Sequence, residues 1–149
     1  YPRTCRYFGH DDPTKLSGAL VRDASRSGDS TIFGGLYMTV NGPTGEHPGQ
    51  EVQADANGEA TFTVTVEGPS WVPADTLEVI VNGVTESTVD LLPMGAGPSK
   101  KFVNQVKVKL DPAATRNWVV CHARGEGDLA PLHPGRKPFA VSNPVFLKK

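Results

Sequence analysis

The chain has 149 residues, of which 38% are hydrophobic, so it is long and apolar enough to form one domain with a real core. Its formal net charge of −1 leaves no basic excess to neutralise phosphates, which excludes general nucleic-acid binding. No apolar run approaches the roughly 20 residues that a membrane helix needs, so no membrane partner is expected.

The N-terminal part is predicted to contain one α-helix at residues 13–27. Asp11-Asp12-Pro13 is a start signal, because Asp caps helix N-termini and Pro is favoured at the first helical position. Gly28 is expected to end the helix as its C-terminal cap. Apolar residues spaced three or four apart form one stripe along this helix: Leu16, Ala19, Leu20 and Ala24.

A strand is predicted next, at residues 31–40. Gly34-Gly35 interrupts it, and two adjacent glycines inside a strand predict a β-bulge, with a close approach of the backbone as the alternative. A glycine pair of this kind is not a phosphate cradle here, because no helix follows it.

The rest of the chain alternates apolar and polar side chains between turn dipeptides, as strands with one buried face do. Asn82-Gly83 is the strongest hairpin signal, because both central residues of a type I′ turn need positive φ. This pattern predicts an immunoglobulin-like antiparallel β-sandwich of about seven strands, preceded by one α-helix and one strand. The strands are expected near residues 50–55, 59–67, 75–82, 84–91, 102–110, 117–124 and 139–147.

Trp71 lies in a rigid crossing between two of these strands, at residues 69–73, which begins and ends with Pro. We expect its side chain to plug the end of the sandwich rather than to offer a platform for a ligand.

The two cysteines, Cys5 and Cys121, are far apart in the sequence. A disulfide between them remains an alternative in an oxidising compartment, but two unpaired thiols are favoured, with Cys121 half-buried in a strand. A secreted or periplasmic location is favoured over a cytoplasmic one, and the sequence does not decide the compartment.

The histidines show no spacing typical of metal ligands. His10 adjoins Asp11-Asp12, but helix capping already explains those carboxylates. His122 is expected to be a hydrogen-bonded histidine on a strand. His47 and His133 lie in Pro/Gly loops, where they would bind a metal if the fold brought them together. No nucleophile elbow, P-loop or dinucleotide motif occurs, and no catalytic, cofactor-binding or metal-binding residue is assigned.

Two stretches carry a resemblance to a known family. Tyr1-Pro2-Arg3-Thr4, the turn Ser27-Gly28-Asp29-Ser30 and residues 31–35 resemble the closing part of the catalytic domain in PHP-type (polymerase and histidinol phosphatase) metallohydrolases. The similarity is to the CehA/McbA-like branch. Trp118-Val119-Val120 and residues 138–146 resemble the C-terminal strand that closes an appended β-sandwich in the same proteins.

The resemblance implies that residues 1–42 are the last helix and strand of a PHP catalytic barrel and that residues 43–149 are a C-terminal β-sandwich domain. The family's barrel holds divalent metals through H-x-H and D-x-H motifs, and neither motif occurs in this chain. The metals are therefore expected in a catalytic domain that precedes Tyr1, and none in this chain. A start on Tyr rather than Met agrees with a processed chain or a fragment. Where the family often has T-G-P, this chain has Phe33-Gly34-Gly35, which puts any contribution of that loop to a substrate pocket in doubt.

Three functions follow as hypotheses. The first is a non-catalytic accessory β-sandwich of a PHP-like metal-dependent hydrolase of the phosphoesterase class, whose partner is its own N-terminal catalytic domain. The apolar stripe on the helix would then pack on the sandwich, mediate self-association or stay exposed. The second is a stand-alone binding module for carbohydrate or protein, which rests on the aromatic residues Tyr37, Trp71 and Trp118. The third is an independent enzyme that uses two of the histidines.

Overall fold

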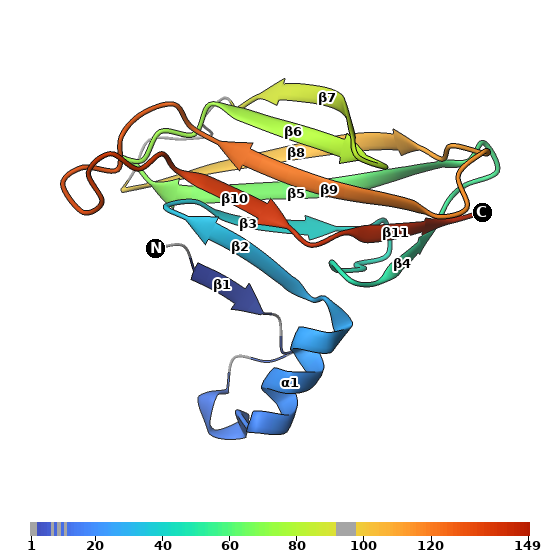
Figure 1. The fold of residues 1–149 in the computed structure, drawn as a ribbon, viewed down its shortest axis with the longest axis horizontal. Coiled ribbons are helices and arrows are strands. Elements are labelled where there is room, and N and C mark those ends of the chain that lie inside the picture. Colours follow the sequence, from blue (N-terminus) through green and yellow to red (C-terminus); the bar gives the residue numbers. More distant parts are fainter. Residues whose placement is uncertain (1–2, 7, 9, 11, 92–97) are drawn as a thin grey trace.

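The computed structural model describes residues 3–6, 8, 10, 12–91 and 98–149, and it confirms a mainly β chain folded as a two-layer sandwich. Figure 1 shows the two sheets stacked, with one helix standing apart from them. The strands within these residues are β1 (Arg3–Arg6), β2 (Ser30–Gly34), β3 (Tyr37–Asn41), β4 (Glu51–Gln53), β5 (Glu59–Pro69), β6 (Thr76–Val81), β7 (Val84–Asp90), β8 (Ser99–Lys109), β9 (Asn117–Arg124), β10 (Phe139–Ser142) and β11 (Val145–Lys148).

The large sheet is built around β9, which pairs antiparallel with β6 along one edge and with β10 and β11 along the other. From there the sheet extends through β10 to β2 and β1, through β6 to β7, and through β11 to β4, whose pairing with β11 is parallel. The strand predicted at 139–147 is thus two strands. They are separated at Asn143 and Pro144, because Pro144 has no N–H to donate to a ladder.

The small sheet consists of β3, β5 and β8, and β5 pairs with β8 along its whole length. The apolar residues that alternate along β5 are fully buried, including Phe62, Val64 and Val66. They form one core cluster with Leu77 of β6 and Val119 of β9, in the opposite layer. Each side chain of this size contributes about 1.5–3 kcal/mol when it is buried, so this interface holds the sandwich together.

Gly34 and Gly35 mark a change of sheet rather than the bulge that was predicted. β2 ends at Gly34 in the large sheet, and β3 begins at Tyr37 in the small sheet. Gly35 has φ of +83°, which a residue with a side chain rarely adopts. Since β2 pairs with β10 and β3 pairs with β5, both strands belong to the sheets of the sandwich. The division of the chain at residues 42 and 43 stays a prediction.

The predicted helix is divided in two. A short 3₁₀ turn spans Pro13–Lys15 and is capped by Asp12, whose carboxylate accepts the Thr14 N–H at 3.0 Å. Leu16 is then extended, and Ser17 caps a second start by accepting the Leu20 N–H at 3.2 Å. The α-helix α1 therefore spans Gly18–Ser27, and it ends at Gly28 with φ of +80°, as predicted. The prediction missed the second cap, because a Ser inside an apolar period looks like an ordinary helix residue.

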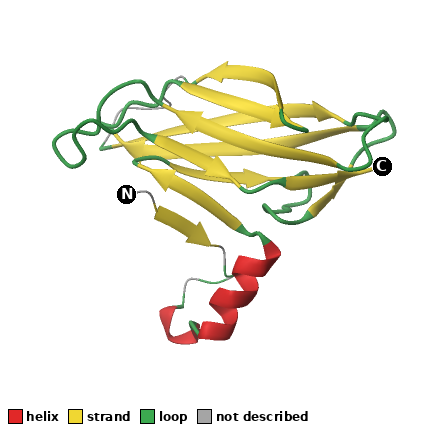
Figure 2. Cartoon of the chain, viewed as in Figure 1, coloured by secondary structure: helices red, strands yellow, loops and turns green. Residues whose placement is uncertain are grey.

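Helix α1 lies outside the two layers, at the lower end of the molecule in Figure 1, and Figure 2 shows that the two layers themselves consist of strands and loops. Within the predicted apolar stripe, Ala24 is buried and Leu20 is half-buried, but Leu16 is 50% exposed and Ala19 is exposed too. The base of the helix is fixed to the sandwich by Asn143, whose side-chain amide donates to the Gly28 carbonyl at 3.0 Å. Much of the stripe stays exposed.

Three local predictions have different outcomes. Asn82 and Gly83 have φ of 50° and 88°, which confirms the hairpin between β6 and β7. Trp71 does not plug the sandwich: its side chain is 47% exposed, and its neighbour Val72 is buried instead. Cys121 is fully buried rather than half-buried, and both Cys5 and Cys121 are free thiols.

Candidate functional site

A cavity of about 400 Å³ lies between the N-terminal segment, strands β2 and β3, and the loop that contains His47. It brings together residues that are distant in the sequence and that carry polar or ionisable groups. Those lining it include Cys5, Arg6, His10, Asp29, Tyr37 and His47. This is the described region in which two of the four histidines come together, and we call it the histidine cavity.

The loop of residues 42–50 brings His47 to this cavity. A main-chain hydrogen bond closes the first part of this loop: the Gly42 N–H donates to the Glu46 carbonyl at 2.8 Å. The side chain of Gln50 accepts the main-chain N–H of His47 at 2.8 Å. Gly49 then packs directly on the end of α1, where a Cβ would lie 1.9 Å from the Ser27 carbonyl oxygen. The loop can therefore approach the helix only because residue 49 is Gly.

The orientation of His10 is set by its own neighbours. Its Nδ1 accepts the main-chain N–H of Asp12 at 3.2 Å, so in the neutral ring Nε2 carries the proton. The same Asp12 caps the 3₁₀ turn, as the sequence predicted. Capping thus accounts for the carboxylate of Asp12, while the main-chain N–H of the same residue fixes the ring of His10.

Asp29 is the ionisable residue of this cavity that sequence reasoning missed. Burial raises the pKa of its carboxyl above the usual value, and the nearby imidazole of His47 partly opposes that shift. The sequence showed Asp29 only as part of the turn after α1, and no local signal connects it with residue 47. The pairing depends on the loop of residues 42–50 folding back on the end of the helix.

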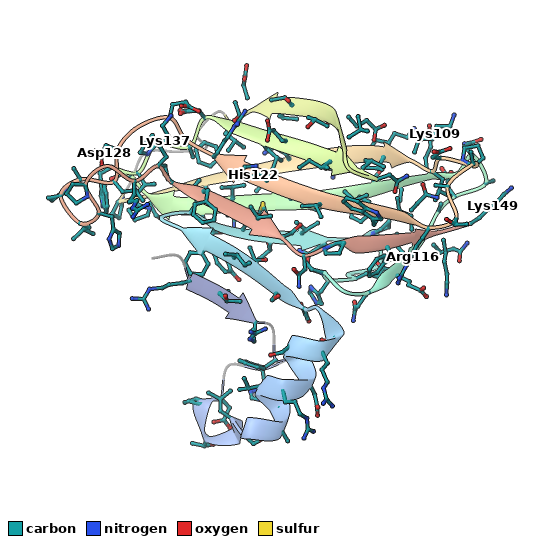
Figure 3. The ribbon with its side chains drawn as sticks, in the orientation of Figure 1. Lys109, Arg116, His122, Asp128, Lys137 and Lys149 are labelled. Carbon is teal, nitrogen blue, oxygen red and sulfur yellow. The ribbon has the colours of Figure 1, made fainter. Side chains whose placement is uncertain are left out.

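The other two histidines lie elsewhere. His122 is on the outer face of β9, near the centre of the large sheet in Figure 3, and its Nδ1 lies 3.2 Å from Glu78 Oε2. The other carboxylate oxygen of Glu78 accepts from the Arg124 guanidinium at 2.8 Å. This confirms a hydrogen-bonded strand histidine. His133 lies in the loop between β9 and β10, where its main-chain N–H donates to the Leu129 carbonyl at 2.9 Å.

The side chains that line the histidine cavity include imidazole, guanidinium and phenol groups, which are hydrogen-bonding groups of the kind that small polar ligands use. Across the part of the chain that the structure describes, no three His, Cys, Asp or Glu side chains are grouped so that they could hold a metal ion. No step of a metal-dependent reaction is assigned to the residues of this cavity.

Comparisons with protein-family models, with curated proteins and with solved structures found no match to this chain. Among the described residues, α1 is far too short to cross a bilayer, and no other helix there could do so.

Proposed function

We propose that this chain is a non-catalytic accessory β-sandwich that belongs to the C-terminal part of a PHP-like metal-dependent hydrolase of the phosphoesterase class. The observation that carries the proposal is the position of α1, which stands off the sandwich with apolar side chains uncovered. The resemblance of residues 1–35 to the end of a catalytic barrel supports the same role. In this proposal the divalent metals and the catalytic groups lie in the preceding domain.

The exposed apolar surface on α1 is the expected contact of that domain. Leu16 is 50% exposed and Val21 is 42% exposed, and both lie in the segment that projects from the two layers. Covering a side chain of this size contributes roughly 1.5–3 kcal/mol at full burial, so a domain docked on α1 and on the residue Leu16 that precedes it would gain from both side chains. Self-association through Leu16, Ala19 and Leu20 would cover part of the same surface, whereas Ala24, the fourth residue of the predicted stripe, is buried.

The direct test compares this chain with a longer natural polypeptide that includes the residues preceding Tyr1. Both are titrated with Mn²⁺, Zn²⁺ and Fe²⁺ and assayed with a generic phosphoester. We expect turnover from the longer protein alone, and slower amide hydrogen exchange in α1 of that protein. Metal-dependent turnover by the shorter chain would overturn the proposal.

A pair of matched variants tests the contact itself. Val21→Gln places an amide on α1, and Val103→Gln places the same group on β8, where Val103 is also 42% exposed. In the longer protein, Val21→Gln should raise hydrogen exchange in α1, whereas Val103→Gln should leave it unchanged. Sedimentation of the shorter chain distinguishes self-association, because a dimer lost in Val21→Gln would assign the surface to a second copy.

The stand-alone binding module remains the second candidate, because neither tryptophan is buried. Trp71 is 47% exposed, and Trp118 is half-buried on the outer face of β9. A glycan array and a protein pull-down with the chain alone would test this role, with Trp71→Ala as the variant that should lose the ligand. A ligand that binds equally well to Trp71→Ala would remove the observation on which the role rests.

A further inference from the structure

A second cavity, of about 710 Å³, lies at the end of the sandwich where β8, β9 and β11 meet their loops. Its walls are the turn at residues 56–58, the β8–β9 loop at residues 110–116 and the last residues of β11. Figure 3 shows Lys109, Arg116 and Lys149 together at this end, far from Asp128 and Lys137 at the other. We call it the basic groove. Its volume falls within the range of about 300–1,000 Å³ that is usual for small-molecule sites.

The charges in the basic groove do not balance. It is lined by the cationic side chains of Lys109, Arg116, Lys148 and Lys149 and by the carboxylates of Glu51 and Asp111. Lys148 forms an ion pair with Glu51, and a carboxylate oxygen of Asp111 accepts the main-chain N–H of Ala113 at 2.9 Å.

Among the residues that the structure describes, three cations of the groove have no carboxylate as an ion-pair partner. Within the described residues Lys109, Arg116 and Lys149 form no ion pair, although Lys101 and Lys107 on the same strand β8 are each paired with a Glu. The chain as a whole has a net charge of −1, so this excess of positive charge is local. Like charges that share one concave surface repel each other, and a bound anion would relieve that repulsion.

Arg116 is held in a geometry that suits an oxyanion. Its guanidinium carbon lies 3.8 Å from the centroid of the Phe146 ring, a cation–π contact that covers one face of the planar group. The N–H donors around the rim of a guanidinium remain available in such a stack. They match the oxygen atoms of a carboxylate or phosphate in pairs.

The walls of the groove are fixed by hydrogen bonds before any ligand arrives. The buried side chain of Asn117 accepts the Asp111 N–H at 2.9 Å and donates to the Asp111 carbonyl at 3.1 Å, which holds the β8–β9 loop. Asp55 accepts the main-chain N–H groups of Asn57 and Glu59 and so holds the 56–58 turn, and the Leu110 N–H joins that turn to the loop through the Gly58 carbonyl at 2.8 Å. Binding to a fixed site loses less conformational entropy.

We propose that the basic groove binds a small polyvalent oxyanion, with Arg116 as the bidentate donor and Lys109 and Lys149 as further positive charges. The ligand carries at least two phosphoryl or carboxylate groups. This inference does not depend on the accessory role, because none of the residues that line the groove belongs to α1.

The test uses the full chain and four defined probes: pyrophosphate, citrate, trigalacturonate and neutral maltotriose. Amide shifts in ¹H–¹⁵N spectra locate the binding, and calorimetry measures the affinity. We expect saturable shifts at residues 109–117 and 146–149 with at least one anion and none with maltotriose. The affinity should fall several-fold as salt rises from about 50 mM to about 200 mM, because exposed charges are screened. Comparing the affinity for pyrophosphate with the affinities for citrate and trigalacturonate shows whether the groove prefers phosphoryl or carboxylate groups.

The variants Arg116→Gln and Lys109→Gln should each weaken binding by roughly tenfold, the factor that corresponds to about 1.4 kcal/mol. The matched controls Lys101→Gln and Lys107→Gln remove the same charge from β8 outside the groove and should bind as the parent does. Because Lys109→Gln leaves the Arg116–Phe146 contact intact, it tests the site even if Arg116→Gln fails to fold. Absence of saturable shifts with all three anions, or equal losses in the controls, would overturn the proposal.

Discussion

Gly35 and Leu129 are in contact where the chain passes from the large sheet to the small one. A Cβ at Gly35 would lie 2.8 Å from a methyl carbon of Leu129, closer than carbon atoms approach each other. Leu129 is 1% exposed and comes from the long loop between β9 and β10. The crossover from β2 to β3 and this loop therefore depend on each other, although almost a hundred residues separate them.

We expect Gly35→Ala to destabilise the protein by about 2 kcal/mol or more. The substitution adds strain at a positive φ and forces Leu129 out of a filled site, and overpacking alone costs about 1–3 kcal/mol. Gly45→Ala is the matched control, because Gly45 has φ of +96° but no atom within 4 Å of its Cβ position. Urea denaturation of both variants separates strain from packing, and equal losses would show that Leu129 does not matter.

Asn117 is expected to be the most important polar side chain for the end of the sandwich that contains the basic groove. It is 7% exposed, and its amide group bonds to Asn82 and to both main-chain groups of Asp111. Asn117→Ala leaves these partners unsatisfied, at about 1–3 kcal/mol for each one that stays buried. Thermal denaturation should therefore show a clear loss, while Asn57→Ala, at an exposed turn position, should change little. A loss of similar size in Asn57→Ala would argue against the anchoring role.

The sandwich could be predicted from the sequence because its signals are local. The alternation along residues 59–67 and the Asn82-Gly83 pair each report a conformation that neighbouring residues decide. The change of sheet at Gly35 was missed because a bulge and a change of sheet look the same in the local sequence. The alternative prediction at this glycine pair, a close approach of the backbone, agrees with the contact between Gly35 and Leu129. Trp71 was misplaced for a related reason: the turn at residues 69–72, in which the Val72 N–H donates to the Pro69 carbonyl, turns Val72 and not Trp71 into the core.

The candidate site was the harder part to predict. His10, Asp29 and His47 line one cavity because the loop of residues 42–50 packs on the end of α1. Gly49 permits this contact because it has no side chain to collide with the helix, and no residue spacing in the sequence indicates it. The basic groove could not be predicted from the sequence, because its cations are far apart in the chain and resemble ordinary surface charges. They lie at the end of β8, in the β8–β9 loop and directly after β11: Lys109, Arg116 and Lys149. The ion pairs of the neighbouring lysines show which cations among the described residues have no carboxylate partner.

The buried thiol of Cys121 should make the protein less stable at alkaline pH. Burial raises its pKa from 9.0 to about 12, so the folded state keeps the proton over a range in which the unfolded state releases it. The contribution of this group is therefore fully present below pH 9.0 and is lost as pH rises toward about 12. The loss is at most about 1.4 kcal/mol per pH unit.

Urea titrations between neutral and alkaline pH would measure this slope, and Cys121→Ala is the control, because it lacks the ionisable group. The difference in stability between parent and variant should change with pH only above the ordinary thiol pKa. A constant difference would mean that the thiol does not titrate differently in the folded state. A thiol reagent offers a second measurement, since Cys121 should react only after unfolding, while the half-buried Cys5 should react earlier.

Replacing Asp29 should show how much its partial burial in the histidine cavity disfavours the charge of this carboxylate. The folded-state pKa of this carboxyl is raised, mainly by burial, so its ionised form is disfavoured at neutral pH relative to the unfolded chain. Asp29→Asn is therefore expected to be at least as stable as the parent at pH 7. This advantage should disappear as pH falls below the ordinary value of 3.8, where the parent carboxyl is protonated in both states.

The nearby His47 gives this prediction a second variant. Because the imidazole lowers the pKa of Asp29, His47→Gln should enlarge the advantage of a following Asp29→Asn change. Chemical denaturation of the four proteins of this double-mutant cycle, at about pH 5.5 and at about pH 3, would measure the coupling, because an imidazole attracts a carboxylate only when it carries a proton. Asp23→Asn, on the exposed surface of α1, is the control for removing a carboxylate. If Asp29→Asn were less stable than the parent at both pH values by the same amount, the residue would be a hydrogen-bonding group and not a buried charge.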